Sequence, residues 1–482
     1  MLDPLRWGLP PQVVAELPAR LADCWERYRV CFWTRTRDQS RYAYHYLSGL
    51  LRMETNRNFR QIGRVTGQAG ENLQHFMSNS PWSAQVVCRQ VRAEIRATPL
   101  LQQGSVLILD ESADAKAGLH SAGSARQHNG RLGKEDVCQV GVFLALANGH
   151  TWTWVDGVLF LPEVWFTPEY AELRQRAGVP EGRTFKTKVE LGWEMIQRAR
   201  QEGLPFEWVA CDDLYGRATW LRAKLAGAHI VYMADVPRNT QVYLERPGWG
   251  IPSRRNRRGK RPAKARVLSP EKPVTVQQVA QRPDTAWYSV RVRSIERGEL
   301  IAPYAARRVW TLRDEQPTEE WLVMRREADG DIRYALSNAH AEEPLERLAW
   351  LEAARCFVER SIQDAKSELG WDEFQAQKLC AWEHQLALTV LASWFIAQTR
   401  LDWVQRFPPD PGLQEALDVE WLPALSMANV RELLRAAMPL PHLSEAEARQ
   451  LVAKHLLNRT RSHKSRLRKQ LQEVRSHTRD PA

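Results

Sequence analysis

Closely spaced cysteines are absent from this sequence. Its seven cysteines are odd in number and widely separated, and no two of them form a CxxC pair. This distribution excludes a thiolate zinc site of the usual spacing and indicates no disulfide framework. The chain opens with MLDPLRWGLP, which lacks the basic and apolar segments of a signal peptide. We therefore expect a reduced, cytoplasmic protein.

Long apolar runs, internal repeats and low-complexity segments are also absent. No apolar run approaches the ~20 residues that a membrane-spanning helix needs, so we expect no membrane partner. Acidic residues are outnumbered, because 57 Asp and Glu stand against 68 Lys and Arg and give a formal net charge of +11. Such an excess favours a polyanionic partner, most often nucleic acid, and the alternative is a merely basic globular protein.

Residues 1–100 are predicted to be helical. Within them, NFRQIGRVTGQAGENLQHFMSNSPW combines a short helix, a turn around Gly67 and a second helix from Glu71 to Met77. This order is typical of a helix-turn-helix DNA-binding motif. A bare helical hairpin is an equally good interpretation, because the spacing of such motifs is loosely constrained.

Residues 101–237 alternate between strand and helix patterns. The apolar runs in SVLILDES, FEWVACDDLYG and HIVYMADVP predict buried strands, and Asn148-Gly149 predicts a hairpin turn. KTKVELGWEMIQRARQEG and ATWLRAKLAGA predict helices, and the Gly-rich AGLHSAGSARQHNGRLGKED predicts a loop. The alternation favours a mixed α/β sheet flanked by helices.

Residues 238–340 predict a β-rich insertion. It begins with a basic, Pro-flanked loop, SRRNRRGKRPAKAR, and continues with WYSVRVR, RRVWTLR, WLVMRRE and IRYALSN, which alternate apolar and polar residues. Such alternation is typical of antiparallel strands with one exposed face. Residues 341–400 return to a helical pattern, and residues 401–482, after the break FPPDPG, are predicted to be helical with a basic tail.

Two aspartates close predicted buried strands. Asp110 follows VLIL and Asp212 follows WVAC, and strand ends are where ligands bind in open α/β sheets. Glu359 adds a third acid from a predicted helix beyond the insertion. Two strand-end aspartates and a helix glutamate suit a site for two Mg²⁺ ions, although structural carboxylates are common. The neighbouring acids that compete with this choice are Glu111, Asp114 and Asp213.

Glu359 lies between two cations on one predicted helix face. Arg355 and Lys366 stand at i−4 and i+7 from it, which places all three on one stripe. An ordinary solvated face, with an i,i+4 pair contributing about 0.3–0.5 kcal/mol, is the plain interpretation.

The middle of the chain, from about Gly104 to Leu388, resembles DDE transposases of insertion sequences, close to the IS701 group within the IS4-like superfamily. The matching segments are VLILDES, HSAGSARQHNGRLGKEDVCQVGVFLALANGHTW, DGVLFLPEVW, FKTKVELGWEMI, CDDLYG, ERSIQDAKSELGWDEFQ and AWEHQLAL. The resemblance implies an RNase H-like core with a β-rich insertion between the second aspartate and the glutamate. It also implies metal-dependent phosphoryl transfer with Mg²⁺ or Mn²⁺.

The resemblance assigns the acids individually. Asp110 and Asp212 match the family's two aspartates, and Glu359 matches the glutamate of its Y-x2-R-x3-E-x6-K signature; all three are expected to be catalytic metal ligands. Tyr215 completes the D-x-x-Y-G context of Asp212 and is expected near DNA.

The rest of the signature is kept in part. Arg355 and Lys366 match its arginine and lysine, and are expected to hold DNA phosphates beside the metals. Glu352 stands at the tyrosine position, which puts that tyrosine's role in doubt here.

Further basic residues are candidates for phosphate contacts, and a solvated basic loop is the alternative for each. Arg126 lies in the predicted Gly-rich loop, and Lys186 and Lys188 precede a predicted helix. The basic loop contributes Arg254, Arg255, Arg257, Arg258, Lys260 and Arg261.

The resemblance implies a nucleoid-associated bacterial enzyme that cuts DNA at the ends of a mobile element and transfers the freed strands to target DNA, by cut-and-paste and through hairpin ends or another route. The N-terminal helices are expected to bind terminal inverted repeats, and a homodimer on DNA is expected. A domesticated, non-catalytic DNA-binding regulator and a nuclease on the same core are the alternatives.

Overall fold

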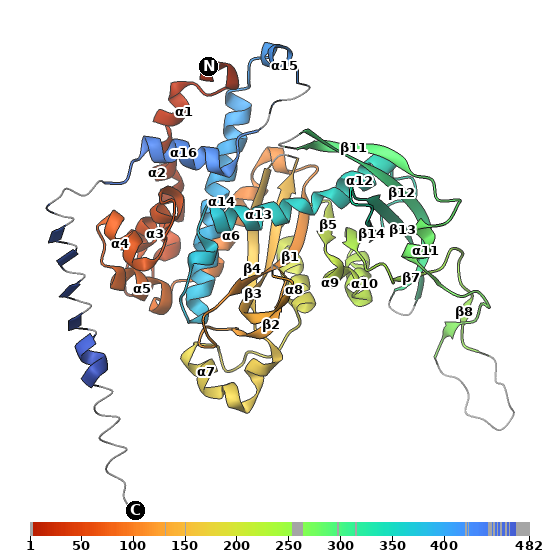
Figure 1. The fold of residues 1–482 in the computed structure, drawn as a ribbon, viewed down its shortest axis with the longest axis horizontal. Coiled ribbons are helices and arrows are strands. Elements are labelled where there is room, and N and C mark those ends of the chain that lie inside the picture. The colour runs from red at the N-terminus through yellow and green to blue at the C-terminus, as the bar shows by residue number, and fades with distance from the viewer. Residues whose placement is uncertain are drawn as a thin grey trace, which may run out of the picture. The chain divides into compact units, whose positions relative to one another are not determined.

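The structure is a computed structural model in which the chain forms two compact units, residues 1–438 and 439–482. It describes residues 3–130, 132–149, 151–252, 264–295, 298–313, 316–419, 422, 424–441, 446, 449–450, 452–453, 456–457, 460–461 and 463–468. In the second unit the described residues from 446 onward are helical. All further description concerns the first unit (Figure 1).

The first unit begins with helices. They are α1 (Pro11–Ala15), α2 (Leu17–Tyr28), α3 (Ser40–Arg52), α4 (Phe59–Thr66), α5 (Gly70–Asn79) and α6 (Ala84–Arg96). The Asn58 side chain caps α4, and Gly67 ends it with a positive φ of 71°. The helices α4 and α5 approach closely, because a Cβ on Gly70, the first residue of α5, would lie 2.9 Å from the Cα atom of Arg60 in α4. The predicted helix–turn–helix pair is therefore present, and its DNA-binding role stays a prediction.

One ten-stranded sheet runs through the unit in the order β11-β12-β13-β14-β6-β5-β1-β3-β2, with β4 paired to β3. Its strands are β1 (Val106–Ala115), β2 (Ala125–Asn129), β3 (Lys134–Asn148), β4 (Thr151–Phe160), β5 (Trp208–Cys211), β6 (Val231–Asp235), β11 (Tyr288–Ile295), β12 (Gly298–Arg313), β13 (Gln316–Arg326) and β14 (Ile332–Ser337). β1, β5 and β6 are parallel, and the other pairs are antiparallel. The prediction of a mixed sheet flanked by helices, of the RNase H-like kind, is confirmed.

The insertion strands extend the core sheet. β14 pairs antiparallel with β6, with Leu336 opposite Ala234, so β11 to β14 continue the same sheet outward. Two short ribbons accompany them, β7 (Gln241–Val242) with β10 (Val274–Thr275) and β8 (Trp249–Gly250) with β9 (Arg266–Val267). This continuity was not predicted, because the pairing of β14 with β6 is non-local.

The prediction of a Gly-rich loop after β1 was wrong in part. Residues Ala125–Asn129 form β2 and pair with the start of β3, with Arg126 opposite Val137. The predicted hairpin at Asn148 is present, since β3 and β4 pair up to Asn148 and Thr151.

The α-helices that follow are α7 (Ala171–Arg176), α8 (Lys188–Gln201), α9 (Asp213–Gly216), α10 (Thr219–Gly227), α11 (Val276–Ala280), α12 (Leu345–Ala354), α13 (Cys356–Ser367), α14 (Leu379–Arg406), α15 (Gly412–Leu417) and α16 (Met427–Ala437). Of these, α8 and α13 pack on opposite faces of the central strands, α8 against β3 and β4 and α13 against β1, β3 and β4. Successive side chains of a strand point to opposite faces. On β1, Leu109 faces α8, where it would lie 2.5 Å from a Cβ on Gly192. Ser112 faces α13 and accepts a hydrogen bond from Lys366 at 2.8 Å.

α14 is the central helix of the unit. It packs against β4 and α6, with further contacts to α3, α5 and α16, and Figure 1 shows it between the N-terminal helices and the sheet. Most of its side chains are buried. No helix in the described part of the chain has both the length and the apolar composition of a membrane-spanning segment.

Candidate active site

Asp110 and Asp212 meet where two parallel strands stop pairing. β1 and β5 pair as far as Leu109 and Cys211, and each aspartate is the next residue. Because the carboxyl ends of parallel strands lie at one edge of the sheet, the two side chains converge. Their carboxylate oxygens lie within 4.8 Å of each other. The two aspartates thus lie close together, as expected. Their catalytic role remains a prediction.

Glu111 is the third member of this acid group. One of its carboxylate oxygens lies within 4.8 Å of those of Asp110 and Asp212. Lys188, the first residue of α8, donates to Glu111 Oε1 at 2.9 Å. The other oxygen, Oε2, is buried and makes no hydrogen bond with any described residue. We name Asp110, Glu111 and Asp212 the acid group.

Burial and neighbouring carboxylates raise the pKa values of the two aspartates. Burial raises the pKa of Asp110 well above its ordinary value, repulsion from Asp212 adds to this, and Arg355 opposes it. Burial likewise raises the pKa of Asp212 to about 6, with a further contribution from Glu111. Both shifts mean that a nearby cation would be favoured, because it would stabilise the ionised carboxylates.

Asp212 also begins α9. Its Oδ1 accepts hydrogen bonds from the backbone N–H groups of Leu214 at 3.0 Å and Tyr215 at 3.4 Å. Asp is a favoured N-cap residue because its oxygen satisfies such free donors. The cap fixes the orientation of the carboxylate at the strand end.

Arg355 pairs with two acids outside the acid group and acts on Asp110 and Asp212 through its charge. Its guanidinium pairs with Asp235 at 3.0 Å and with Glu359 at 2.9 Å. Asp235 ends β6, the next parallel strand, and burial raises its pKa, which Arg355 opposes. Asp235 was missed by the sequence analysis, although it too is an acid at the end of an apolar strand.

Glu359 does not belong to the acid group. Its side chain is 54% exposed and paired with Arg355 one helical turn earlier. It lies on α13, the helix that covers the same face of β1 as Asp110. Glu359 therefore lies on the same side of the sheet as Asp110, and its assignment as the third metal ligand remains a prediction.

Lys366 and Tyr215 lie largely inside the protein, and their expected contacts with DNA stay a prediction. Lys366 is only 11% exposed and pairs with Asp114 at 2.9 Å. It also donates a hydrogen bond to Ser112 Oγ. Its ammonium group therefore has partners within the protein. Tyr215 is fully buried, and burial raises the pKa of its hydroxyl well above the ordinary value.

Glu352, at the signature's tyrosine position, is buried against the insertion strands. It is 5% exposed and accepts hydrogen bonds from the Tyr304 hydroxyl and from Arg325, both at 2.9 Å. Burial raises its pKa, which Arg325 opposes. Glu352 thus joins α12 to the insertion strands β12 and β13.

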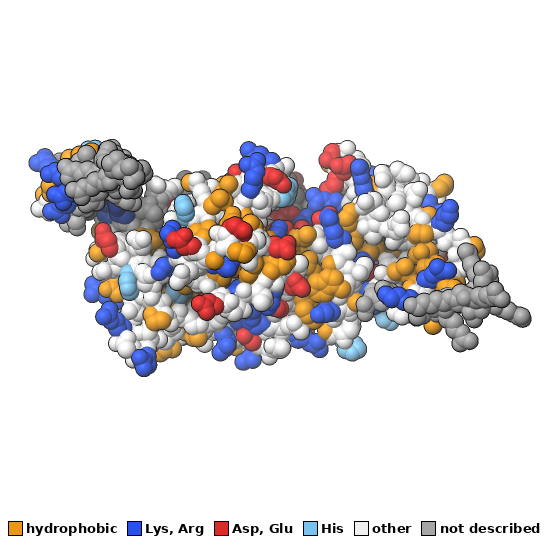
Figure 2. All heavy atoms as spheres, turned by 90° about the horizontal axis from the view of Figure 1, so that it is seen from below, with side chains coloured by type: hydrophobic (Ala, Val, Ile, Leu, Met, Phe, Trp, Pro, Cys, Tyr) orange, Lys and Arg blue, Asp and Glu red, His pale blue; other side chains and the backbone are white. Residues whose placement is uncertain are grey.

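The other predicted phosphate contacts differ in exposure. Arg126 is 75% exposed on β2, whereas Lys188 is 22% exposed and bound to Glu111. Lys186 is 39% exposed and pairs with Glu194. Arg254, Arg255, Arg257, Arg258, Lys260 and Arg261 lie outside the described residues. Figure 2 shows Lys and Arg side chains scattered over one face of the molecule among Asp and Glu.

The acid group fits a hard divalent cation. It offers only oxygen donors, which Mg²⁺ and Mn²⁺ prefer. The unpartnered Glu111 Oε2 and the raised pKa values of Asp110 and Asp212 both mark a deficit of positive charge at this point. These observations suit a site for Mg²⁺ or Mn²⁺.

Comparisons with known proteins agree with this geometry. A segment of 164 residues is 27% identical to a protein from Microchaete diplosiphon described as a probable transposase for insertion sequence element IS701. The matched segment is 33% of this chain and spans 38% of that relative's length. A family model described as DDE superfamily endonuclease matches residues 28–299. That match contains the acid group and ends before Glu359. Since it spans more than half of the 482 residues, the chain belongs to the DDE superfamily endonuclease family.

Proposed function

We propose that this protein is the transposase of an insertion sequence, which cleaves DNA at the element ends and transfers the freed strands. The observation that carries the proposal is the meeting of Asp110 and Asp212, far apart in sequence, within 4.8 Å at the ends of two parallel strands. Family membership and the net charge of +11 support a DNA substrate.

Asp110 and Asp212 would hold the divalent metal, Mg²⁺ or Mn²⁺. When bound, the metal would activate a water and stabilise the charge that develops on the scissile phosphate. Arg355 orients Asp235 and Glu359 and opposes the repulsion between the aspartates. Glu359, whose side chain is 54% exposed, would join the metal site when DNA is bound.

The reaction proceeds by hydrolysis at each element end, which frees a 3′-OH. This hydroxyl would then attack a second phosphodiester, either on the opposite strand, to give a hairpin end, or in target DNA. A new P–O3′ bond would form, the existing P–O3′ bond would break, and the displaced strand would leave with a 3′-OH. The pair α4 and α5 would bind the terminal inverted repeats. Because two ends must be cut and joined together, the active species would be a homodimer assembled on DNA.

A cleavage assay tests the proposal. Purified protein is incubated with end-labelled DNA carrying the element terminus and Mg²⁺ or Mn²⁺, and products are resolved on denaturing gels. Asp212→Asn should abolish nicking and retain the fold, because Asn also caps helices well. Asp213→Asn is the matched control, since Asp213 is 47% exposed and pairs only with Arg217 among the described ion pairs.

The product pattern separates the alternatives. Metal-dependent nicking with joined or hairpin products supports the transposase, and nicking without any joining identifies a nuclease. End binding without nicking in both metals would refute the enzyme and support a DNA-binding regulator.

A further inference from the structure

We infer that Glu111 is a metal ligand of this site, forming with Asp110 and Asp212 a three-carboxylate set that is assembled before DNA binds. The inference rests on the proposed metal-dependent function. It adds a residue that follows the first aspartate directly and lies outside the Asp, Asp and Glu set expected from the resemblance.

The local fold explains how adjacent residues reach one site. Asp110 and Glu111 point to opposite faces of β1, as neighbours on a strand do. The edge of β1 is covered by β5 only as far as Leu109. Beyond that residue the edge is open, so the longer Glu111 side chain reaches round it to the carboxylates of Asp110 and Asp212. Pairing of Glu111 with Val142 of β3 keeps its backbone fixed.

One buried polar atom at this place makes no hydrogen bond with any described residue. It is Glu111 Oε2, which belongs to a carboxylate within 4.8 Å of those of Asp110 and Asp212. Buried polar atoms in folded proteins almost always have a partner. A cation bound by Glu111 would supply one to this oxygen.

The contacts of the two glutamates favour Glu111 in the DNA-free protein. Glu359 is 54% exposed and its carboxylate is paired with Arg355. Glu111 is 21% exposed and keeps one oxygen free while the other is paired with Lys188 at 2.9 Å. A structural ion pair between Glu111 and Lys188 is the competing explanation, and it makes the opposite prediction for Lys188 variants.

Mn²⁺ binding to the DNA-free, full-length protein tests the inference. Affinity is measured by titration with detection of free Mn²⁺ by electron paramagnetic resonance. Glu111→Gln should weaken Mn²⁺ binding by at least about tenfold, the lower range seen when residues around a metal are changed. Lys188→Met should strengthen it, because a competing cation is removed. Glu359→Gln should leave it within about twofold.

A matched control is the exposed pair Lys186–Glu194 beside the site, where Glu194→Gln should change nothing. Mn²⁺ affinity unchanged in Glu111→Gln but lost in Asp212→Asn would overturn the inference and leave the proposed function intact. Weakened binding in both Glu111→Gln and Lys188→Met would also overturn it, in favour of the structural pair. Absence of Mn²⁺ binding to the DNA-free wild type overturns it as well. Glu111-dependent binding without any DNA nicking would uphold the inference and refute the proposed function.

Discussion

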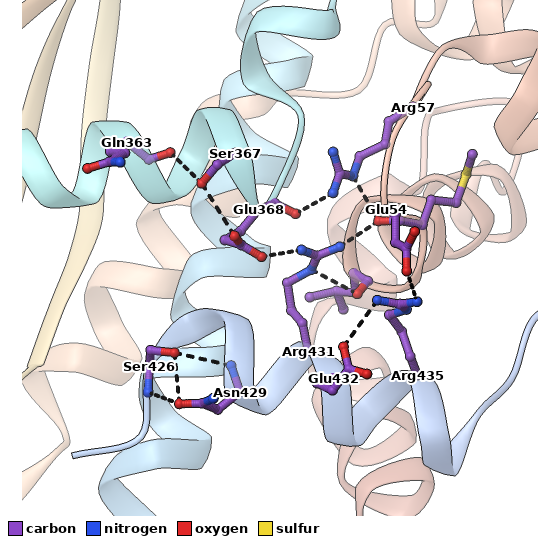
Figure 3. Close-up of polar contacts among 12 residues, drawn as sticks. Glu54, Arg57, Gln363, Ser367, Glu368, Ser426, Asn429, Arg431, Glu432 and Arg435 are labelled. Atoms are coloured by element: carbon purple, nitrogen blue, oxygen red, sulfur yellow. Dashed lines mark hydrogen bonds and ion pairs between the residues drawn. The ribbon is translucent and has the colours of Figure 1, made fainter. Parts of the chain in front are cut away.

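Arg431 of α16 joins three segments that are far apart in sequence. Its guanidinium donates to the backbone carbonyls of Leu51 and Met53, at the end of α3, and pairs with Glu368, directly after α13 (Figure 3). Arg431 is only 5% exposed. The same segments are tied by Arg57, which donates to the Glu368 carbonyl oxygen at 2.8 Å. The helix that carries Glu359 is thus fixed to the N-terminal helices through buried charges.

Arg431→Ala should destabilise the protein by about 3 kcal/mol. Removing one partner of a buried ion pair costs about 3–5 kcal/mol, because the other charge is left buried and unpaired. Glu368, which is 23% exposed, would lose its partner, and the buried carbonyl oxygens of Leu51 and Met53 would lose their donor. Part of the loss is offset at Arg57, because burial and then repulsion from Arg431 lower the pKa of Arg57 to about 10. Relief of that repulsion places the expected value at the low end of the range.

Arg435→Ala is the matched control, one turn further along the same helix. Arg435 pairs with Glu54 and Glu432, whose side chains are 67% and 74% exposed, and exposed pairs contribute ~0–1 kcal/mol. The assay is the midpoint and slope of the first cooperative urea transition for each variant. If the two variants differ by less than about 1 kcal/mol, the reasoning about Arg431 as a buried junction is refuted, given the size of the expected gap.

Three shorter predictions concern the site and the helix pair. Because burial raises the pKa of Asp212 to about 6, its native state binds more protons than the unfolded chain from about pH 4 to 6. Metal-free stability should therefore fall as pH rises through that window, and the Mn²⁺-induced increase in melting temperature should be larger at pH 7 than at pH 5. Lys366→Met breaks the buried pair with Asp114 and should cost about 3 kcal/mol in urea unfolding, while the salt slope of DNA binding stays unchanged; a slope reduced by about one would restore Lys366 as a phosphate contact. Gly63→Ala places a Cβ 2.5 Å from the Gln68 carbonyl oxygen and should cost about 1–3 kcal/mol by thermal or urea unfolding; an unchanged midpoint would contradict the close packing of α4 and α5.

The convergence of Asp110 and Asp212 was predictable, because both close apolar strands and parallel strands end at one edge. Glu111 was predicted only as a competing acid, and strand alternation places its side chain on the opposite face from Asp110. Only the non-local pairing of β1 with β5, which stops at Leu109, leaves the edge open for it. Where a neighbouring strand ends cannot be read from the sequence of β1 itself.

Lys366 shows the same limit for helices. The helical period predicts that Lys366 shares a stripe with Arg355 and Glu359, but the period alone does not say what lies beneath that stripe. In the structure, the face of β1 that carries Ser112 and Asp114 lies beneath Lys366. Ser112 accepts a hydrogen bond from the Lys366 ammonium group, and Asp114 forms an ion pair with it. The pairing of the insertion strands with the core sheet could not be predicted for a similar reason. An alternating pattern predicts a strand, but it does not identify the strand with which it pairs.

The charge balance of the site predicts how many metals it holds before and after DNA binds. Its described carboxylates are Asp110, Glu111, Asp212, Asp235 and Glu359, and its described cations are Arg355 and Lys188. With all groups ionised the sum is −5 + 2 = −3. One divalent cation leaves −1, which still repels a DNA phosphate, whereas two give +1, which one phosphodiester neutralises. We therefore expect one Mn²⁺ to bind the DNA-free protein tightly and a second to bind only with DNA, and titrations of Mn²⁺ with and without an uncleavable end duplex measure the two stoichiometries. Two tight sites without DNA would contradict the charge argument.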